Sequence, residues 1–416
     1  MRTSKITALL LASMLATSAY AIENVKVNGQ AKLWYQTGVK DNSPSGVDMF
    51  QQKAAVGQAG LELGVKADLF DGLKGKASVI VLDSLGLEKS FVKDISSAGA
   101  GHEDGAYYRT QIWITEANLD YKISNTSIVA GRQALNTPLL FTERWNTSFN
   151  TFDGAIVLNS DIPKTTLVAG WVAQHNGGAS AGNGTATGFP STTMHNGEFY
   201  GFGSSYAGGV VTDGNKDLYM VGAMIKPTKG VALNLWYYDI NDVLNAYWAD
   251  ASYKDSGLFV GIQNGGVDSD TAGSDNSMVT AVKLAYTVDK LNVNVSYSTT
   301  DDTGTATIAN FATGDKSKVY TQAVFQDGGI VGYRDTEAWK LGVSYKFDGV
   351  KIISFLQNTE SDAHSMKDGT EFDLIAVGKV GKHLNLKGIY VHRDVDMRTS
   401  ADFKQDAIRI IASVKF

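Results

Sequence analysis

Along most of the chain, apolar and polar side chains alternate with a period of two, and clusters of Gly, Asp and Asn interrupt the alternation. Residues 59–69, for example, place leucine and valine side chains on one face and Glu62, Lys66 and Asp68 on the other. Successive side chains of a strand point to opposite faces, so these segments predict β-strands with one apolar and one polar surface. Strands of about ten residues with this pattern are typical of transmembrane barrels, although soluble β-sandwiches share it.

The connections between these segments alternate in length. Tight turns such as that at 69–72 are separated by long polar loops such as 134–151. Short turns on one rim and long loops on the other are typical of an outer-membrane barrel, and a soluble sandwich has no reason to keep that order. The segments number about 18, with a range of roughly 16 to 20, as expected for such barrels. The range is wide because loops 176–216 and 300–335 could each hide a hairpin, with 319–325 as a weak strand.

The last segment ends the chain on Phe416, and the apolar side chains from Ile408 to Val414 share its face. A final strand that ends in an aromatic residue is typical of the strand that closes an outer-membrane barrel, with Phe416 in the aromatic girdle. We therefore predict an all-β protein. Under this prediction, residues 22–416 form one transmembrane antiparallel β-barrel, with short periplasmic turns and long extracellular loops.

The first residues predict export. Arg2 and Lys5 precede an apolar stretch over 6–16, and Ala19–Ala21 fits the small-x-small pattern of a cleavage site. This arrangement predicts a Sec-type signal peptide over residues 1–21, because the apolar stretch is too short to span a membrane. Beyond it, no uncharged apolar run approaches the roughly 20 residues that a membrane helix needs.

Composition and charge exclude several function classes. The chain has no Cys, which excludes disulfides, thiolate–metal sites and cysteine nucleophiles. Its 37 basic and 43 acidic side chains give a net charge of −6, so we expect no nucleic-acid partner. The six His show no metal-ligand spacing, and the loop that begins at Asp268 has Val279 where a calcium loop needs an acid. We predict no metal, no cofactor and, since no Ser/His/Asp set is recognisable, no enzymatic activity.

Three runs close to one another carry a recognisable motif, namely Gly131–Leu139, Phe141–Asn146 and Asn150–Asp153. They resemble the major outer membrane porins of the campylobacterial type, which group with OprD-type channels. Thr115–Tyr121 and the ending Val414–Phe416 add to the resemblance, which is specific over 110–175 and at both ends of the chain. The resemblance implies a water-filled, homotrimeric diffusion channel in the bacterial outer membrane, surrounded by outer-membrane lipid and lipopolysaccharide.

Residues 134–151 form the third long loop, which in porins folds into the lumen and narrows it. An irregular loop inside a barrel is tolerated because protein and water satisfy its backbone. Pro138 would restrict the backbone where the loop enters the lumen, and the apolar residues 139–141 would pack on the inner wall. An ordinary external loop is the alternative. The predicted constriction residues are Arg132, Thr137, Pro138, Glu143, Arg144 and Trp145.

The wall that faces this loop is predicted to carry charge. Side chains of the preceding strand point inward if Leu119 and Tyr121 face lipid, where an Arg at the midplane would cost about 2–4 kcal/mol. Opposed charges across a pore produce a field that selects solutes by charge. The predicted lumen-wall residues are Arg109, Glu116, Asp120 and Arg409.

These observations predict an outer-membrane porin for the passive diffusion of small hydrophilic solutes and ions. A substrate-selective channel of the OprD type and a structural or adhesive barrel with a plugged lumen are the alternatives. The excess of acidic side chains favours a mild preference for cations, against which Arg132 and Arg144 would act if they lie at the narrowest section.

Overall fold

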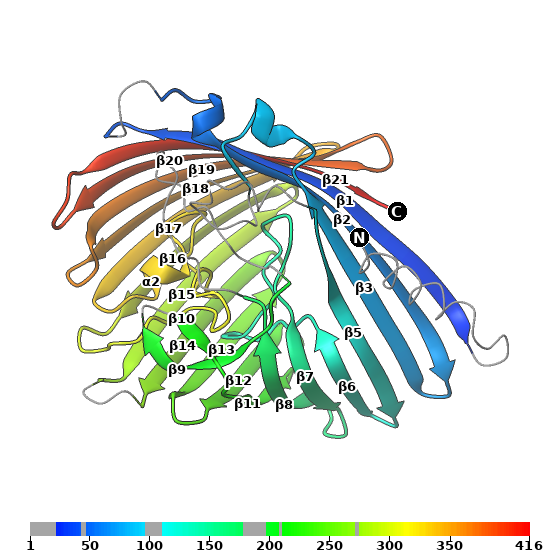
Figure 1. Ribbon diagram of the computed structural model, residues 1–416. Helices are drawn as coiled ribbons and strands as arrows, with labels where there is room; N and C mark the ends of the chain where they lie inside the picture. The colour runs from blue at the N-terminus through cyan, green and yellow to red at the C-terminus, as the bar shows by residue number, and fades with distance from the viewer. Residues whose placement is uncertain (1–21, 43–46, 96–109, 178–196, 208–209, 271–273) are drawn as a thin grey trace.

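Antiparallel strands make up most of the chain that the computed structural model describes, namely residues 22–42, 47–95, 110–177, 197–207, 210–270 and 274–416. Figure 1 shows them curving around a common interior. Their bounds are β1 (Glu23–Lys40), β2 (Ala55–Phe70), β3 (Leu73–Asp83), β4 (Asp94–Ile95), β5 (Gln111–Ile123), β6 (Thr126–Gln133), β7 (Phe152–Asn159), β8 (Thr165–His175), β9 (Gly201–Ala207), β10 (Val210–Gly214), β11 (Leu218–Ile225), β12 (Val231–Ile240), β13 (Leu244–Asp255), β14 (Leu258–Ser269), β15 (Ser277–Val288), β16 (Leu291–Thr300), β17 (Thr336–Lys346), β18 (Val350–Ser361), β19 (Met366–Val380), β20 (Leu384–Met397) and β21 (Phe403–Lys415).

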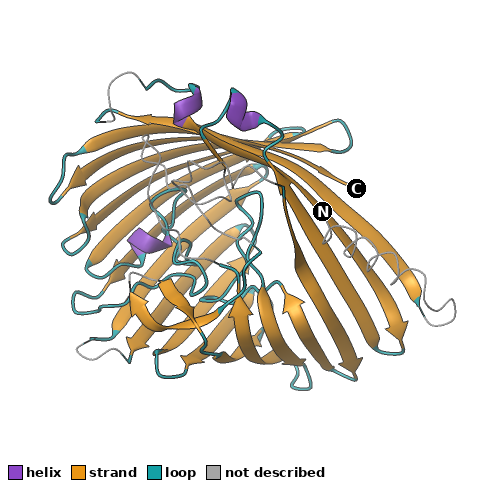
Figure 2. Cartoon of the chain, viewed as in Figure 1, coloured by secondary structure: helices purple, strands orange, loops and turns teal. Residues whose placement is uncertain are grey.

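Helix is sparse in the described residues, as Figure 2 shows. It consists of two short 3-10 helices, η1 (Gln52–Ala54) and η2 (Leu87–Lys89), and one turn of α-helix, α2 (Gly328–Val331). None of these is long and apolar enough to cross a membrane.

The main sheet closes on itself between the two ends of the chain. It contains 19 strands, of which β4 is a two-residue stub beside β2, so 18 strands form the wall. β1 pairs with β2 on one side and with β21 on the other, in a register that runs from Gln30 with Lys415 to Lys40 with Gln405. A closed sheet has no edge whose N–H and C=O groups lack partners. The predicted barrel of about 18 strands is confirmed.

The two faces of the wall strands differ, and the apolar face is the outer one. In β17 the exposed positions are Trp339, Leu341 and Val343, and the buried positions that alternate with them are mostly polar or small. A soluble sandwich would bury its apolar face and expose its polar face. The reverse order is that of a barrel with lipid outside and a polar lumen inside.

The two loops that could hide a hairpin differ. The connection between β8 and β11 contains the hairpin β9–β10, which forms a separate two-stranded sheet. Residues 319–325 form no strand, so the weak strand expected there is wrong. The reason is that its backbone N–H groups bond to side chains of the wall: Tyr320 donates to Gln263, and Phe325 donates to Glu371.

Two connections fold into the barrel, where Figure 1 shows them crossing the interior. Residues 134–151 join β6 to β7, and residues 301–335 join β16 to β17. Their buried apolar side chains, such as Leu140 and Phe311, belong to one cluster with inward-facing residues of the wall from β7 to β15. The lumen is therefore filled in part by packed protein.

Gly131 is a position of β6 that does not accommodate a side chain. Its φ is +113°, and a Cβ there would lie 2.3 Å from the carbonyl oxygen of Ala117 on β5. We expect Gly131→Ala to destabilise the barrel by about 1–3 kcal/mol through backbone strain and to lower the urea concentration at the midpoint of unfolding. Gly388→Ala is the matched control, because its Cβ would meet nothing within 4 Å. Equal midpoints for the two variants would contradict the prediction.

Candidate functional site

The first half of the loop 134–151 anchors it to the inner wall. The Thr137 hydroxyl donates to the carbonyl of Leu140 at 2.7 Å and closes a turn that contains Pro138. This turn seats Leu139 and Leu140, both fully buried, against the cluster that includes Tyr238 of β12. Thr137 and Pro138 therefore hold the loop in place and do not line the pocket described below.

The loop 301–335 binds the loop 134–151 inside the barrel. The amide of Phe311 donates to the carbonyl of Leu139 at 2.8 Å. The Asn310 side chain donates to the carbonyl of Phe141 at 2.9 Å and to Oε1 of Glu143 at 2.8 Å. The two loops therefore form one unit across the lumen.

Glu143 connects the parts of this unit. Its side chain is almost completely buried, and Oε1 also accepts from the hydroxyl of Thr313. Oε2 accepts from the indole N–H of Trp145 at 2.8 Å. A buried carboxylate needs such donors, because its desolvation is otherwise costly. Glu143 thus fixes the position of Trp145 relative to Asn310 and Thr313.

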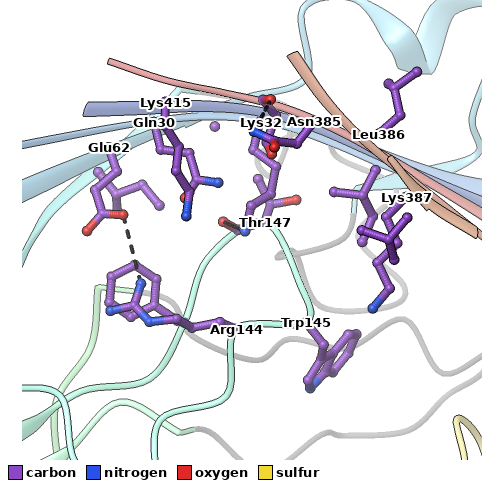
Figure 3. A pocket seen from close by; sticks show the side chains of 16 residues that line it. Gln30, Lys32, Glu62, Arg144, Trp145, Thr147, Asn385, Leu386, Lys387 and Lys415 are labelled. Atoms are coloured by element: carbon purple, nitrogen blue, oxygen red, sulfur yellow. Dashed lines mark hydrogen bonds and ion pairs between the residues drawn. The ribbon is translucent and has the colours of Figure 1, made fainter. Parts of the chain in front are cut away.

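The tip of the loop 134–151 reaches the opposite wall. Lys32 of β1 donates to the carbonyl of Asn146 at 2.7 Å. Arg144 points toward Glu62 of β2, with 4.0 Å between Nη1 and Oε2, as the dashed line in Figure 3 marks. The Arg144 guanidinium also lies 3.7 Å from the centroid of the Phe149 ring. The loop therefore spans the lumen from β6 and β7 to β1 and β2.

A pocket of about 310 Å³ lies between this tip and the wall (Figure 3). Its charged lining consists of four cations and one acid, and the cations come from both the loop and the wall. The charged and polar side chains that line it are Gln30, Lys32, Glu62, Arg144, Thr147, Asn385, Lys387, Ser413 and Lys415. We call this space the candidate constriction.

Arg409 of β21 lies deep in the wall beside the candidate constriction. Its Nε donates to the side chain of Gln36 at 2.8 Å. Its guanidinium lies 5.3 Å from the ring centroids of both Trp34 and Trp145. The structure therefore brings together Glu143, Arg144, Trp145 and Arg409 among the residues that the sequence predicted.

Sequence reasoning missed the anchors of the loop 301–335. The Glu371 carboxylate on β19 accepts the amides of Phe325 and Gln326 at 2.8 and 2.6 Å. Asp373, also on β19, accepts the amide of Val324 at 3.2 Å. Acidic residues at alternating positions of a predicted strand were a signal for lumen-facing groups, but nothing in the sequence indicated their partners.

A charged cluster lies within the loop 301–335 itself. Lys316 donates to Asp327 at 2.8 Å. Burial alone would lower the pKa of Lys316, but Asp327 and Asp315 raise that pKa above its ordinary value. Burial and the neighbouring Asp327 and Glu143 carboxylates raise the pKa of Asp315 well above its ordinary value. Lys316 is therefore ion-paired with Asp327, and burial beside two other carboxylates disfavours the charged form of Asp315.

Arg132 lies apart from the candidate constriction. Its Nε and Nη2 donate to the Asp153 carboxylate on β7 at 2.7 and 2.8 Å. Its guanidinium also stacks on Phe199, 3.4 Å from the ring centroid. Arg132 therefore links β6 to β7 and does not line the pocket beside Arg144.

The remaining predicted residues lie elsewhere. Glu116 pairs with Lys76 at 2.6 Å, and Asp120 accepts from Ser127 at 2.6 Å. Asp120 and Lys76 line a second pocket of about 500 Å³ near the short turns, away from the candidate constriction. The backbone of Phe416 exchanges hydrogen bonds with Gly29 of β1 at 2.8 and 3.0 Å, which extends the pairing that closes the barrel. Arg109 and residues 1–21 lie outside the described residues.

Within the part of the chain that the structure describes, no three His, Asp or Glu side chains gather in a way that could hold a metal ion. The chemistry available at the candidate constriction is electrostatic and hydrogen-bonding. It could attract, orient and pass a charged solute.

Comparisons with known proteins agree with this architecture. Residues 95–376 match the sequence profile of the OprD family, described as outer membrane porins. The fold is similar to that of Pseudomonas aeruginosa OpdO, with a TM-score of 0.71 and 14% identity over 95% of this chain and 98% of that one. No curated protein matches the sequence significantly.

Two further solved structures share the fold. Pseudomonas aeruginosa OccK8 (OprE) has a TM-score of 0.70 and 15% identity, covering 96% of this chain and 99% of that one. Acinetobacter baumannii OccAB4 has a TM-score of 0.72 and 12% identity, covering 94% of this chain and 98% of that one.

The Glu143 contacts generate a prediction. In Glu143→Gln the side-chain amide would face the indole N–H of Trp145 or the Asn310 donor, and an unpaired buried donor costs about 1–3 kcal/mol. We expect Trp145 and the loop tip to loosen, so that single-channel conductance and current noise rise in planar bilayers while the barrel stays folded. Asp348→Asn, in an exposed turn, is the control and should leave both unchanged. A Glu143→Gln channel with wild-type conductance and noise would show that Glu143 does not hold the passage in shape.

Proposed function

Because this chain belongs to the OprD family of outer membrane porins, we propose that solutes cross its barrel by passive diffusion through the candidate constriction. The protein lies in the bacterial outer membrane and forms a channel for solute uptake. Under this proposal it carries out no chemistry on its solutes and needs no cofactor. The loop 134–151, with Glu143, Arg144 and Trp145, sets the resistance of the pore.

The excess of cations around the candidate constriction indicates which solutes the channel favours. Lys32, Arg144, Lys387 and Lys415 oppose the single acid Glu62 around the passage. At physiological salt the Debye length is about 8 Å, so nearby charges outweigh the net charge of the whole chain. We therefore favour small anionic solutes, carboxylates among them, over the mild cation preference that the acidic composition predicts.

A second set of cations also favours anionic solutes. The pocket near the short turns is lined by Lys26, Lys66, Lys74 and Lys76, against the acids Asp68 and Asp120. These lysines lie on the inward face of β1, β2 and β3, at the end of the lumen opposite to the long loops. An anion that passed the candidate constriction would leave along an electrically favourable path.

Planar-bilayer recording of the purified protein tests this function. We expect ohmic single-channel steps and, in a salt gradient, a reversal potential that indicates anion preference. Arg144→Glu should move the reversal potential toward cations, because it replaces a cation of the lining by an acid. Lys290→Glu makes the same charge change in an exposed turn and is the matched control. An equal shift in both variants would locate selectivity outside the candidate constriction.

The same recordings separate the alternatives. A solute that blocks the current at low concentration would indicate a substrate-selective channel. Silence would indicate that the loops 134–151 and 301–335 close the lumen, as in a structural or adhesive barrel.

We also propose that the protein is a homotrimer, as the resemblance to campylobacterial-type porins implies. Small outward-facing side chains support this: Ala67, Ala77, Ala117 and Ala130 border a shallow hollow of about 560 Å³ on the outer wall. Small residues allow close approach of neighbouring barrels. We expect the protein in detergent to sediment as a trimer in analytical ultracentrifugation, and Ala117→Trp to yield monomers. A wild-type monomer would contradict the proposal.

We propose that residues 1–21 are removed on export, so that the mature chain begins at Ile22, because the first residues have the pattern of a signal peptide. Within the family, we place the chain with the campylobacterial-type major porins on the strength of the motif between Gly131 and Asp153.

A further inference from the structure

Residues 321–327 of the loop 301–335 lie against the inner wall, and we call them the strap. The amides of Phe325 and Gln326 donate to the two oxygens of the Glu371 carboxylate at 2.8 and 2.6 Å. The amide of Val324 donates to the carboxylate of Asp373 at 3.2 Å. Both acids lie on β19 and are fully buried. Two carboxylates of one wall strand therefore hold three successive amides of the strap.

The carbonyls of the strap are bound by polar side chains of the wall. Lys340 of β17 donates to the carbonyl of Gln322, and Gln357 of β18 donates to the carbonyl of Gln326 at 3.2 Å. The largest apolar side chain of the strap, Phe325, is only partly buried. Hydrogen bonds to charged and polar side chains therefore attach the strap more than apolar burial does.

The strap is in contact with the surroundings of the candidate constriction. The ring of Phe325 contacts the guanidinium groups of Arg393 and Arg409, which lie 5.3 and 5.7 Å from its centroid. Arg409 also lies 5.3 Å from the ring centroid of Trp145, which lines the candidate constriction. Because the strap rests on the wall, it can move away only toward the lumen.

The contact between the strap and the wall contains buried polar atoms without hydrogen-bond partners. In the described residues these atoms are Nε2 and Oε1 of Gln326, Oε1 of Gln357, Oγ1 of Thr359 and Oδ1 of Asp373. The Gln326 side chain lies against Gly369 of β19, the register partner of Thr359. A buried polar group without a partner is costly. Release of the strap would admit water to these atoms, which offsets part of the free energy that holds the strap.

Cations from the wall and from the loop surround Glu371 and Asp373. They are Lys316 of the loop, Lys340 of β17, Arg393 of β20 and Arg409 of β21, with Lys283 of β15 facing Lys340. The other acids that interact with Lys316 are Asp315, Asp327 and Glu143 of the interior loops. Burial and the neighbouring Asp327 and Glu143 carboxylates raise the pKa of Asp315, so Asp315 loses its charge early as the pH falls. Glu371 and Asp373 therefore supply much of the negative charge that balances these cations.

We propose that the strap is a lid that closes the channel at acid pH. Protonation turns the Glu371 and Asp373 carboxylates into acids that accept fewer hydrogen bonds and donate one, so their hold on the three amides weakens. The surrounding cations are then left with fewer counter-charges. The freed strap moves into the lumen beside the candidate constriction and lowers the conductance. Closure rests on the proposed channel function, whereas release of the strap does not.

Hydrogen–deuterium exchange of the full-length protein measures the strap without any need for conduction. After correction for intrinsic exchange rates, the amides of Val324, Phe325 and Gln326 should lose roughly tenfold or more of their protection between about pH 7 and about pH 4, since hydrogen bonds to charged groups are lost. Glu371→Gln replaces an acceptor by a donor and should show the low protection already at pH 7. Glu360→Gln makes the same change at an exposed position of β18 and should behave as the wild type.

Gln326→Met gives a test of opposite sign. It replaces the unpaired amide by an apolar side chain of similar length, so the strap is held more firmly and its release needs a lower pH. In planar bilayers the wild-type conductance should fall on acidification. It should be low at pH 7 in Glu371→Gln, and in Gln326→Met it should fall only at a lower pH than in the wild type.

Three results would overturn the proposal, each with circular dichroism that shows folded barrels. The first is strap protection that does not change between about pH 7 and about pH 4 in the wild type. The second is a shift of the same sign in Glu371→Gln and Gln326→Met. The third is release of the strap without a fall in conductance. Absence of current at every pH would instead contradict the proposed channel function, and the exchange data would still decide whether the strap is released.

Discussion

The rest of the structure depends on one constraint, namely that no backbone N–H or C=O group can lack a partner in the hydrocarbon layer. The pairing of β1 with β21 meets it, and the hydrogen bonds between Gly29 and Phe416 extend that pairing to the last residue. Once the sheet is closed, the apolar face of each strand must point outward to lipid and the polar face inward to water. The inward faces of the wall strands then either pack against the interior loops or line the candidate constriction.

The same constraint explains the interior loops. A loop inside a barrel must find hydrogen-bond partners on the wall or in another loop. The Glu371 carboxylate accepts hydrogen bonds from two backbone amides of the loop 301–335. The Lys32 ammonium donates hydrogen bonds to two backbone carbonyls of the loop 134–151. Charged side chains of the wall therefore have two roles. Some bind the interior loops, and others, such as Lys387, line the candidate constriction, where they can contact solutes.

Charge and apolar area are distributed locally, and their positions matter more than their totals. The chain is acidic overall, yet cations predominate around the candidate constriction. On the outer surface, apolar area is expected wherever lipid is the solvent. The functional proposal about selectivity follows from this local arrangement of charge.

The sequence by itself determined the strands, their two faces and the long loop at 134–151, because a period of two depends only on neighbouring residues. It also indicated that Glu143, Arg144, Trp145 and Arg409 belong to the lumen. Only the tertiary structure decided that the loop 301–335 joins them, and that Arg132 pairs with Asp153 away from the passage. These contacts join residues far apart in the chain. Barrel closure and the packing of loops against remote strands bring these residues together. A pattern of neighbouring residues in the sequence does not indicate which remote residues will meet.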